Sequence, residues 1–353
     1  MNFQIGRFKI GDNSPTLIVA EMSGNHGGSF NRAIKIIKAA KRAGANAIKL
    51  QTYTADTITL KSNKKDFLIS KKSPWSHHKN LWNLYNHAYT PWKWQKKIFV
   101  KAKNIGLNIF SSPFDEYAVD FLKSLNCCAY KIASSEINHI PLLEKVAKTN
   151  KPVILSTGLA SEKDIDLAIY TLKKNGAKKI VLLLCVSNYP ATTKELNLRK
   201  INYFKRKYKV LVGLSDHTIG SVAATTSVSL GACLVEKHFN LQDNKKTVDS
   251  FFSCKEKDFK LMVKKIREVE LALGNKNLKS VEKKILGKKE MRSIYICKDV
   301  RKGEKLTNKN IKVVRPGHSL HPKYFKKILG YKVKKKLKYG DRIKLNYLVN
   351  FKN

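Results

Sequence analysis

Residues 210–240 read VLVGLSDHTIGSVAATTSVSLGACLVEKHFN, and this stretch contains two short apolar runs that each lead into a histidine. His217 follows the first run and His238 follows the second, 21 positions later. That spacing fits one helix and one strand, which predicts both imidazoles at the same end of neighbouring parallel strands. Neutral imidazole is a common ligand of divalent transition metals, so the pair predicts a metal site. The alternative is that each histidine is a hydrogen-bonded structural group.

Six further apolar runs precede this stretch, each bounded by turn or helix signals. Together the runs predict eight strands, at residues 16–20, 47–50, 107–110, 129–132, 153–155, 180–185, 210–214 and 233–235. Amphipathic segments between them predict helices, among them 31–43, 117–125, 141–149 and 162–175. Eight alternating strands and helices predict an α/β fold of the (β/α)8 TIM-barrel type. A doubly wound open sheet is the alternative, but its glycine-rich first turn is missing here.

The chain divides into a barrel domain, a linker and a small C-terminal domain. We assign residues 1–275 to the barrel and the lysine-rich residues 276–290 to the linker. Residues 291–353 contain short apolar runs and glycine turns, and a domain of that size would be marginal alone, so we expect it to dock on a barrel. An insertion at residues 54–94 carries all four tryptophans. We interpret it as a packed surface segment that covers one end of the barrel.

Composition excludes several classes of protein. The chain has 353 residues, of which 42% are hydrophobic, but no apolar run approaches the roughly 20 residues that a membrane span needs, so we expect no membrane partner. The first ten residues lack the apolar core of a signal peptide, and we expect a cytoplasmic protein. Six cysteines show no spacing typical of zinc sites or disulfides. Cys185 is interpreted as a small core residue, and Cys254 is expected in a loop.

The net charge of +44 is the second compositional feature. Its source is mostly lysine spread over nearly every predicted helix and loop, rather than arginine clustered with aromatic residues. We therefore predict no nucleic-acid partner, although the charge should attract anionic substrates.

Polar side chains follow or interrupt the predicted strands, and in a barrel these positions face one shared mouth. Lys49 and Lys131 interrupt apolar runs, where an unpaired ammonium is costly. Either they pair with carboxylates such as Glu21 or Glu136, or they hold one phosphate or carboxylate together, which nearby serines favour. A metal beside them would polarise a carbonyl, and Glu21 and Glu136 are candidate catalytic residues that would transfer a proton or bind substrate hydroxyls. These residues predict a metal-dependent lyase or transferase acting on a phosphorylated or carboxylated small molecule.

The strand-end segments closely resemble the sialic acid synthase family over nearly the whole chain. The motifs that carry the resemblance are Glu21–His26, Ile48–Thr52, Ser111–Phe114, Tyr130–Ser134, Ser156–Gly158, Gly213–Thr218 and Glu236–Phe239. The C-terminal residues 292–345, with Lys302-Gly303-Glu304 and Arg315-Pro316-Gly317, look like the antifreeze-like (SAF) domain of those enzymes.

The resemblance implies that phosphoenolpyruvate condenses with an open-chain N-acetylated amino sugar, giving a nine-carbon 2-keto acid and phosphate. By similarity, phosphoenolpyruvate would be held by Lys49, Ser112, Lys131, Ser134, Ser156 and Ser215. The sugar would be contacted by Glu21, Gln51, Tyr189 and Asp249, with Glu136 as the preferred proton-transfer group. His217 and His238 would bind Mn²⁺, with Mg²⁺ or Co²⁺ as alternatives, to orient the aldehyde and activate the attacking water. A domain-swapped homodimer is also implied, in which Arg315 reaches the N-acetyl group in the partner's barrel.

The choice of sugar is predicted from the residues beyond His238. Residues 247–253 read TVDSFFS and, with Ala20–Ser23, resemble the pseudaminic acid branch of the family. That branch uses 2,4-diacetamido-2,4,6-trideoxy-L-altrose, and aromatic residues here suit a 6-deoxy sugar. The neuraminic and legionaminic branches, which use N-acetylmannosamine or a 6-deoxy-mannose analogue, are alternatives. A heptulosonate-type barrel would lack the C-terminal domain, and a non-enzymatic carbohydrate- or nucleic-acid-binding protein would have no use for this constellation.

Overall fold

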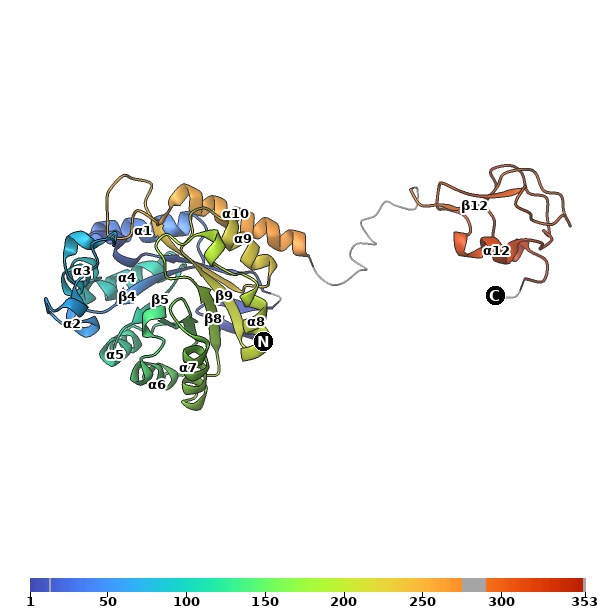
Figure 1. Ribbon diagram of the computed structural model, residues 1–353. Helices are drawn as coiled ribbons and strands as arrows, with labels where there is room; N and C mark the ends of the chain where they lie inside the picture. The colour runs from blue at the N-terminus through green and yellow to red at the C-terminus, as the bar shows by residue number, and fades with distance from the viewer. Residues whose placement is uncertain (13, 275–289, 352–353) are drawn as a thin grey trace. The chain divides into compact units, whose positions relative to one another are not determined.

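Eight parallel strands close into a barrel, which confirms the predicted fold class (Figure 1). The structure is a computed structural model that describes residues 1–12, 14–274 and 290–351. Each strand pairs with the next in chain order, and β10 pairs with both β9 and β3, which closes the sheet. The strands are β3 (Leu17–Glu21), β4 (Ala47–Thr52), β5 (Asn108–Pro113), β6 (Tyr130–Ile132), β7 (Val153–Ser156), β8 (Ile180–Cys185), β9 (Leu211–Asp216) and β10 (Leu234–Asn240).

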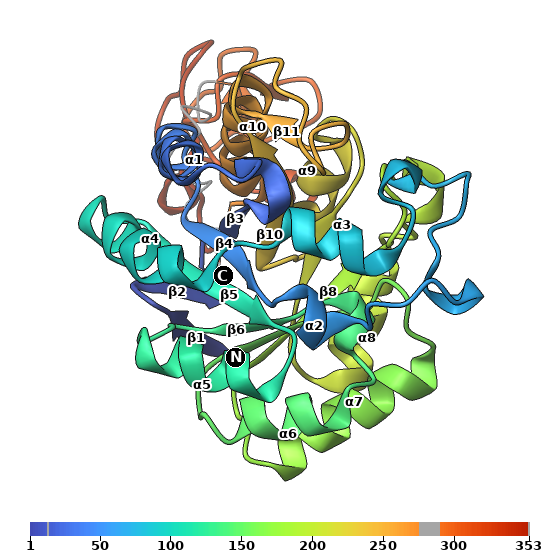
Figure 2. The same ribbon diagram turned by 90° about the vertical axis from the view of Figure 1, so that its left-hand side faces the viewer.

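Helices lie outside the strands on all sides of the barrel (Figure 2). They are α1 (Phe30–Arg42), α4 (Trp92–Asn104), α5 (Glu116–Ser124), α6 (Ile140–Ala147), α7 (Glu162–Lys174), α8 (Lys200–Tyr208), α9 (Val222–Ser229) and α10 (Glu256–Leu273). Side-chain caps begin several of them because the first backbone N–H groups of a helix lack partners. The Asp115 carboxylate, for example, accepts from the backbone N–H of Ala118 at 2.7 Å at the start of α5.

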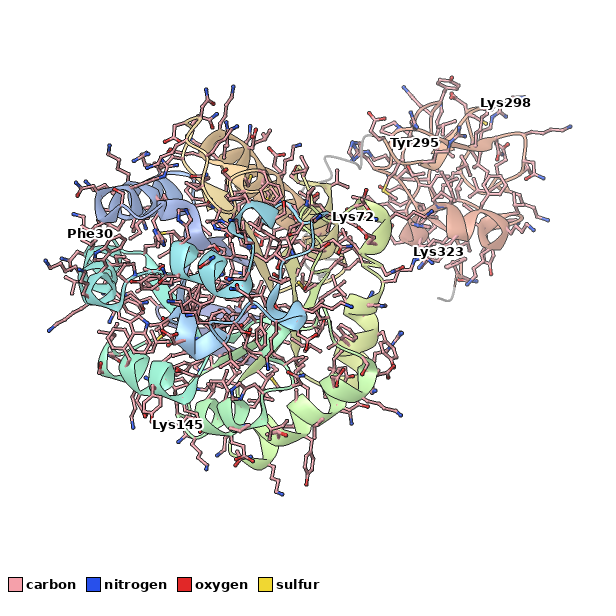
Figure 3. All side chains as sticks on the ribbon, turned by 60° about the vertical axis from the view of Figure 1, so that its left-hand side comes forward. Phe30, Lys72, Lys145, Tyr295, Lys298 and Lys323 are labelled. Atoms are coloured by element: carbon pink, nitrogen blue, oxygen red, sulfur yellow. The ribbon has the colours of Figure 1, made fainter. Side chains whose placement is uncertain are left out.

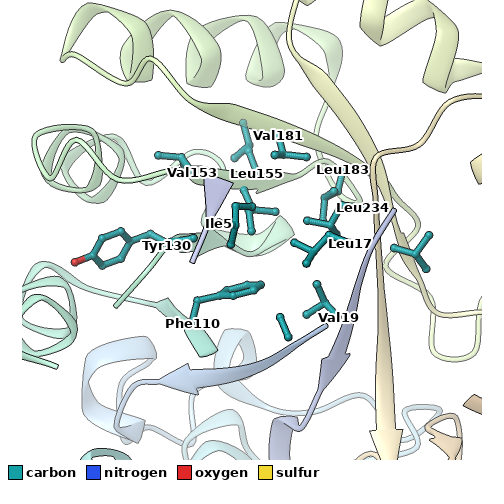
Figure 4. Packing of buried hydrophobic residues seen from close by; sticks show 14 of the residues in the cluster. Ile5, Leu17, Val19, Phe110, Tyr130, Val153, Leu155, Val181, Leu183 and Leu234 are labelled. Atoms are coloured by element: carbon teal, nitrogen blue, oxygen red, sulfur yellow. The ribbon is translucent and has the colours of Figure 1, made fainter. Parts of the chain in front are cut away.

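The barrel interior is filled with apolar side chains at the end where the strands begin (Figure 4). Alternate residues of each strand point inward, and Leu17, Val19, Phe110 and Leu234 are fully buried there. Ile5 joins them from a hairpin of β1 (Asn2–Ile5) and β2 (Phe8–Gly11), which the sequence reading did not predict. With this end plugged, polar inward-facing residues are concentrated at the opposite end, where the strands finish.

The strands differ from their predicted bounds mainly by running further toward the barrel mouth. β10 continues through Glu236 and His238 to Asn240, although its apolar run ends at Val235. Ladder hydrogen bonds join backbone groups, so they continue where the side chains have become polar. Cys254, which was expected in a loop, instead begins the short strand β11 (Cys254–Lys255) beside β10.

The insertion after β4 contains two helices and two single turns. They are α2 (Ala55–Ile58), η2 (Lys65–Phe67), η3 (Ser76–His78) and α3 (Leu81–Ala88). Other single turns follow barrel strands, namely η1 (Ser23–His26), η4 (Ser134–Glu136) and η5 (Thr193–Glu195).

A second compact unit, Asn275–Asn353, follows the unit Met1–Gly274. It pairs β12 (Ser293–Ile296) with antiparallel β13 (Ile311–Val314) and has its own apolar core, including Ile294, Val300 and Leu337. Its described residues also form η6 (Pro322–Tyr324), α12 (Phe325–Ile328) and η7 (Leu345–Tyr347). The predicted linker, residues 276–290, lies outside the described residues except for Glu290.

Lysines cover the outside of both units (Figure 3). Lys72 and Lys145 of the first unit and Lys298 and Lys323 of the second extend away from the ribbon. Among the described residues, no helix has the length and apolar character to cross a membrane.

Candidate active site

Two buried lysines and two buried glutamates form a charged cluster at the barrel mouth. Lys49 Nζ donates to Glu236 Oε1 at 2.7 Å and lies 3.3 Å from Glu21 Oε2. Lys131 Nζ lies 3.7 Å from the same Glu236 oxygen and donates to the backbone carbonyl of Ile132. Each of the four side chains is at most 5% exposed. Lys49 is paired with Glu21, as one interpretation predicted, and both lysines also lie near Glu236, which that interpretation did not name.

Burial and mutual attraction set the charges of this cluster. Burial raises the pKa of Glu21 to about 7, although the nearby Lys49 lowers it. Burial also lowers the pKa of Lys131 to about 8. Burial also opposes charge on Glu236, but Lys131 and Lys49 hold the pKa of that carboxyl below its usual value. Lys131 is thus the lysine with the weaker negative partner, and a bound anion would supply the missing negative charge.

Unpartnered serine hydroxyls include those of residues on β5 and β7, the strands on either side of β6, which carries Lys131. The Oγ atoms of Ser112 and Ser156 are buried without a hydrogen-bond partner, and so is that of Ser187. Ser134 Oγ accepts from the backbone N–H of Gly158 at 2.9 Å. A Cβ at Gly158 would lie 2.2 Å from Ser187 Oγ and 2.9 Å from Ser134 Oγ, so a larger residue there would displace these hydroxyls. Buried hydroxyls without partners are uncommon and suit a polar ligand between them.

The two predicted metal ligands lie side by side, with ring centroids 5.4 Å apart. Neighbouring strands β9 and β10 bring them together, and Gly213 permits the close packing of these strands, since a Cβ there would lie 2.4 Å from the carbonyl oxygen of Leu234. His217 Nδ1 lies 2.7 Å from the Val186 carbonyl, which can only accept, so this nitrogen carries the proton. His238 Nδ1 is buried without a partner. Burial, together with His217, lowers the pKa of His238 well below its usual value and keeps it neutral.

Cys185 is also part of the site, which its interpretation as a core residue missed. Its Sγ lies 4.0 Å from His217 Nδ1 at the end of β8. Burial opposes charge on both groups, but their attraction prevails, so the pKa of Cys185 falls to about 7 and that of His217 rises. The strand position of Cys185, in line with the other strand ends, was the signal that could have identified it.

The loop beyond β10 places Asp249 beside the histidines. Asp249 Oδ2 lies 3.9 Å from His238 Nδ1 and accepts a hydrogen bond from Ser23 Oγ. Burial raises the pKa of this carboxyl. Tyr189, from the loop after β8, lies against His217 with ring centroids 4.4 Å apart, and burial raises the pKa of its phenol.

Glu136 and Gln51 occupy the same mouth. Burial raises the pKa of Glu136 to about 7 even though Lys131 and Lys49 lower it, and its Oε2 is buried without a partner. Gln51 donates to Glu21 Oε1 at 3.1 Å. Ser215 Oγ lies 3.4 Å from Glu236 Oε1. All the predicted site residues of the first unit therefore have positions around one barrel mouth.

Arg315 lies in the second unit, 66% exposed, with Glu290 Oε2 at 3.5 Å. Its role stays a prediction, because it depends on where the second unit lies relative to a barrel.

Glu236 is the important residue that sequence reasoning left without a role. It stands two positions before His238 on the same strand face, and this period of two could have identified it.

Comparisons with known proteins identify the family of the chain. A profile of the NeuB family matches residues 36–278, and one of the SAF domain matches residues 291–348. Pseudaminic acid synthase of Campylobacter jejuni is 44% identical over 97% of this chain and 98% of its own length. The Helicobacter pylori protein of that name is 43% identical over 92% and 95% of the two chains. The solved structure of the Bacillus subtilis spore coat polysaccharide biosynthesis protein SpsE matches with a TM-score of 0.68 at 30% identity, covering both chains completely.

The NeuB match spans more than half of the chain, and the SAF match falls within the second unit. Both confirm the resemblance carried by the strand-end motifs. The chain belongs to the NeuB family of sialic acid synthases.

Proposed function

We propose that the protein is a pseudaminic acid synthase, which condenses phosphoenolpyruvate and water with 2,4-diacetamido-2,4,6-trideoxy-L-altrose to give pseudaminic acid and phosphate. The observation that carries the proposal is the pair of buried lysines, Lys49 and Lys131, beside the histidine pair at one barrel mouth. The choice of sugar is supported by the pseudaminic acid synthases that are 43–44% identical over nearly the whole chain.

In this proposal phosphoenolpyruvate binds at the lysines. Its carboxylate and phosphate need cations and donors, which Lys131 and the unpartnered hydroxyls of Ser112 and Ser156 supply. The other residues proposed to bind phosphoenolpyruvate are Lys49, Ser134 and Ser215. Lys131 Nζ lies 3.7 Å from Glu236 Oε1, which is beyond hydrogen-bond distance, so its ammonium can donate a hydrogen bond to the anion while its attraction to Glu236 remains.

Proton transfer is assigned to Glu136. With a pKa raised to about 7 by burial, this carboxyl exchanges protons readily near neutral pH, and its unpartnered Oε2 is available to a reacting group. Glu21, Gln51, Tyr189 and Asp249 are assigned to the sugar. Tyr189 lies against His217 and Asp249 lies 3.9 Å from His238, and the four side chains together offer both donors and acceptors, as an open-chain polyhydroxyl substrate requires.

The histidine pair fits a divalent metal ion. His238 Nδ1 is a buried orphan, and His217 keeps Nε2 free because Nδ1 donates to a carbonyl. Among the described residues no three His, Cys, Asp or Glu side chains form a metal-binding group, so the protein would supply two ligands and leave other positions open. When bound, Mn²⁺, or Mg²⁺ or Co²⁺ in its place, would polarise the aldehyde and acidify a bound water.

Phosphate release from phosphoenolpyruvate, measured with a panel of amino sugars, tests the proposed function. We expect release with the 2,4,6-trideoxy-altrose sugar, loss of release after thorough chelation, and recovery on addition of Mn²⁺. Equal turnover of N-acetylmannosamine would contradict the sugar assignment. Turnover that survives chelation would contradict the metal assignment.

The pH dependence of kcat/KM should identify the proton-transfer group. Glu136 is ionised above about pH 7, and Lys131 loses its charge above about pH 8, so activity should rise through the first value and fall through the second. Glu21 and Cys185 share the lower value, and the variants Glu136→Gln, Glu21→Gln and Cys185→Ser separate the three groups. We expect only Glu136→Gln to remove the acid limb. Persistence of that limb in Glu136→Gln, with its loss in one of the other two variants, would reassign the role to that residue.

We also propose the domain-swapped homodimer, with Arg315 completing the partner's sugar site. The second unit has its own core, and the side chain of Arg315 is 66% exposed, so it can contact another subunit.

We also propose a cytoplasmic location. The six cysteines are all free thiols, which supports a reducing compartment.

Mixing two inactive variants tests this exchange. Arg315→Ala lacks the sugar contact and His238→Ala lacks a metal ligand, but a mixed dimer pairs an intact barrel with an intact Arg315. Random subunit exchange should restore about a quarter of wild-type activity, since half of the dimers are mixed and each has one complete site. If each chain completes its own site, mixing restores nothing, and light scattering reports the oligomeric state of each sample.

A further inference from the structure

We propose that Trp75 and Phe251 form an apolar wall that selects the acceptor sugar, by contacting the methyl end of a 6-deoxy sugar and disfavouring a hydroxyl at that carbon. The inference rests on the proposed function and deepens it by naming the residues that discriminate between sugars. It also gives the insertion at residues 54–94 a role in sugar selection, whereas the sequence predicted only a packed surface segment.

The two residues of the apolar wall come from segments far apart in the chain. Trp75 lies in the insertion after β4, and Phe251 lies in the loop between β10 and β11, yet their ring centroids are 5.7 Å apart. Phe252 lies 4.9 Å from Phe251 and 4.7 Å from His238. Trp75 also meets Tyr189, which lies against His217. An aromatic surface therefore runs from the histidine pair out to the apolar wall.

The order of groups at the mouth places the methyl end of the sugar at this wall. The lysines hold the enolpyruvate, and the histidines mark the position of the aldehyde, so the sugar carbons extend away from the lysines. The carbon farthest from the aldehyde is the methyl carbon of a 6-deoxy sugar. Phe251 is 45% exposed, so its ring offers apolar surface that a methyl group can bury.

The apolar wall has no free hydrogen-bond donor for a hydroxyl group. Its one polar atom, Trp75 Nε1, already donates to the carbonyl of Val248 at 2.9 Å. A hydroxyl pressed against the two rings would lose its water without gaining a partner, which is unfavourable. The same hydrogen bond makes Trp75 a positioning residue, because Val248 precedes Asp249, whose carboxylate lies 3.9 Å from His238.

Two variants of Trp75 separate these roles. The measurement is kcat/KM for the 6-deoxy sugar and for its 6-hydroxy counterpart, each with phosphoenolpyruvate. An apolar pocket rejects an added hydroxyl by about 100-fold, so we expect that preference in the wild type and about 10-fold or less in Trp75→Ala. Trp75→Phe keeps a ring but loses the N–H, so it should retain the preference while kcat/KM falls equally for both sugars.

Trp82 provides a matched control. It also lies in the insertion, and its Nε1 donates to Asp56 Oδ1 at 2.8 Å, away from the wall. We expect Trp82→Ala to keep the wild-type preference. If circular dichroism shows that Trp75→Ala does not fold, Phe251→Ala is used in its place. The Phe251 side chain is already partly exposed, so its loss should disturb the fold less. An unchanged preference in the folded wall variants overturns this inference alone, whereas a wild type that does not use the 6-deoxy sugar overturns the proposed function.

Discussion

His238→Ala is expected to abolish turnover while the barrel stays folded. The imidazole is one of the two ligands that the described part of the chain offers to the proposed metal, and its Nδ1 has no hydrogen bond that the fold would lose. Loss of an outer-shell partner of a metal costs about 10–100-fold in affinity or activity, and loss of a ligand should cost more. Phosphate release, bound Mn²⁺ by elemental analysis and circular dichroism should be measured on the same sample.

The matched control for this variant is His87→Ala, an exposed histidine in the insertion. It should keep wild-type turnover and metal content. Retention of a tenth or more of the wild-type kcat by His238→Ala would contradict the role assigned to the histidine pair. Normal Mn²⁺ content with lost turnover would move His238 from metal binding to substrate binding.

Lys49→Met is expected both to destabilise the barrel and to prevent phosphoenolpyruvate binding. The substitution leaves Glu21 and Glu236 buried with only Lys131 nearby, at 3.7 Å from one of them. Removing one partner of a buried ion pair typically costs about 3–5 kcal/mol. Urea unfolding should show the loss of stability, and titration calorimetry should show the loss of phosphoenolpyruvate affinity.

The double variant Lys49→Met/Glu21→Gln separates the two effects. Glu21→Gln removes the carboxylate that the loss of Lys49 leaves without a cation, while Glu236 keeps Lys131 at 3.7 Å, so stability should recover in large part. Affinity for phosphoenolpyruvate should not recover, because the cation is still missing. The surface variant Lys145→Met, which breaks an ion pair with Asp120 at 2.9 Å, should change stability by less than about 1 kcal/mol. Wild-type affinity in Lys49→Met would refute the anion site.

Much of the fold followed from local pattern. The eight apolar runs became the eight barrel strands, because a parallel strand covered on both faces needs a continuous apolar segment. The positions of Lys49, Ser215 and His217 at the mouth followed from the same runs. The N-terminal hairpin was missed because its strands are four residues each, too short for a periodic signal.

The sequence by itself determined which side chains stand at the barrel mouth, since strand order and the alternation of inward and outward residues are local properties. Only the tertiary structure decided which of them meet. It joined Lys49 and Lys131 through Glu236, placed Cys185 beside His217, and brought Trp75 to Val248 across the mouth. Closing a barrel brings residues of distant segments within a few ångströms, and no local pattern encodes which pairs that closure forms.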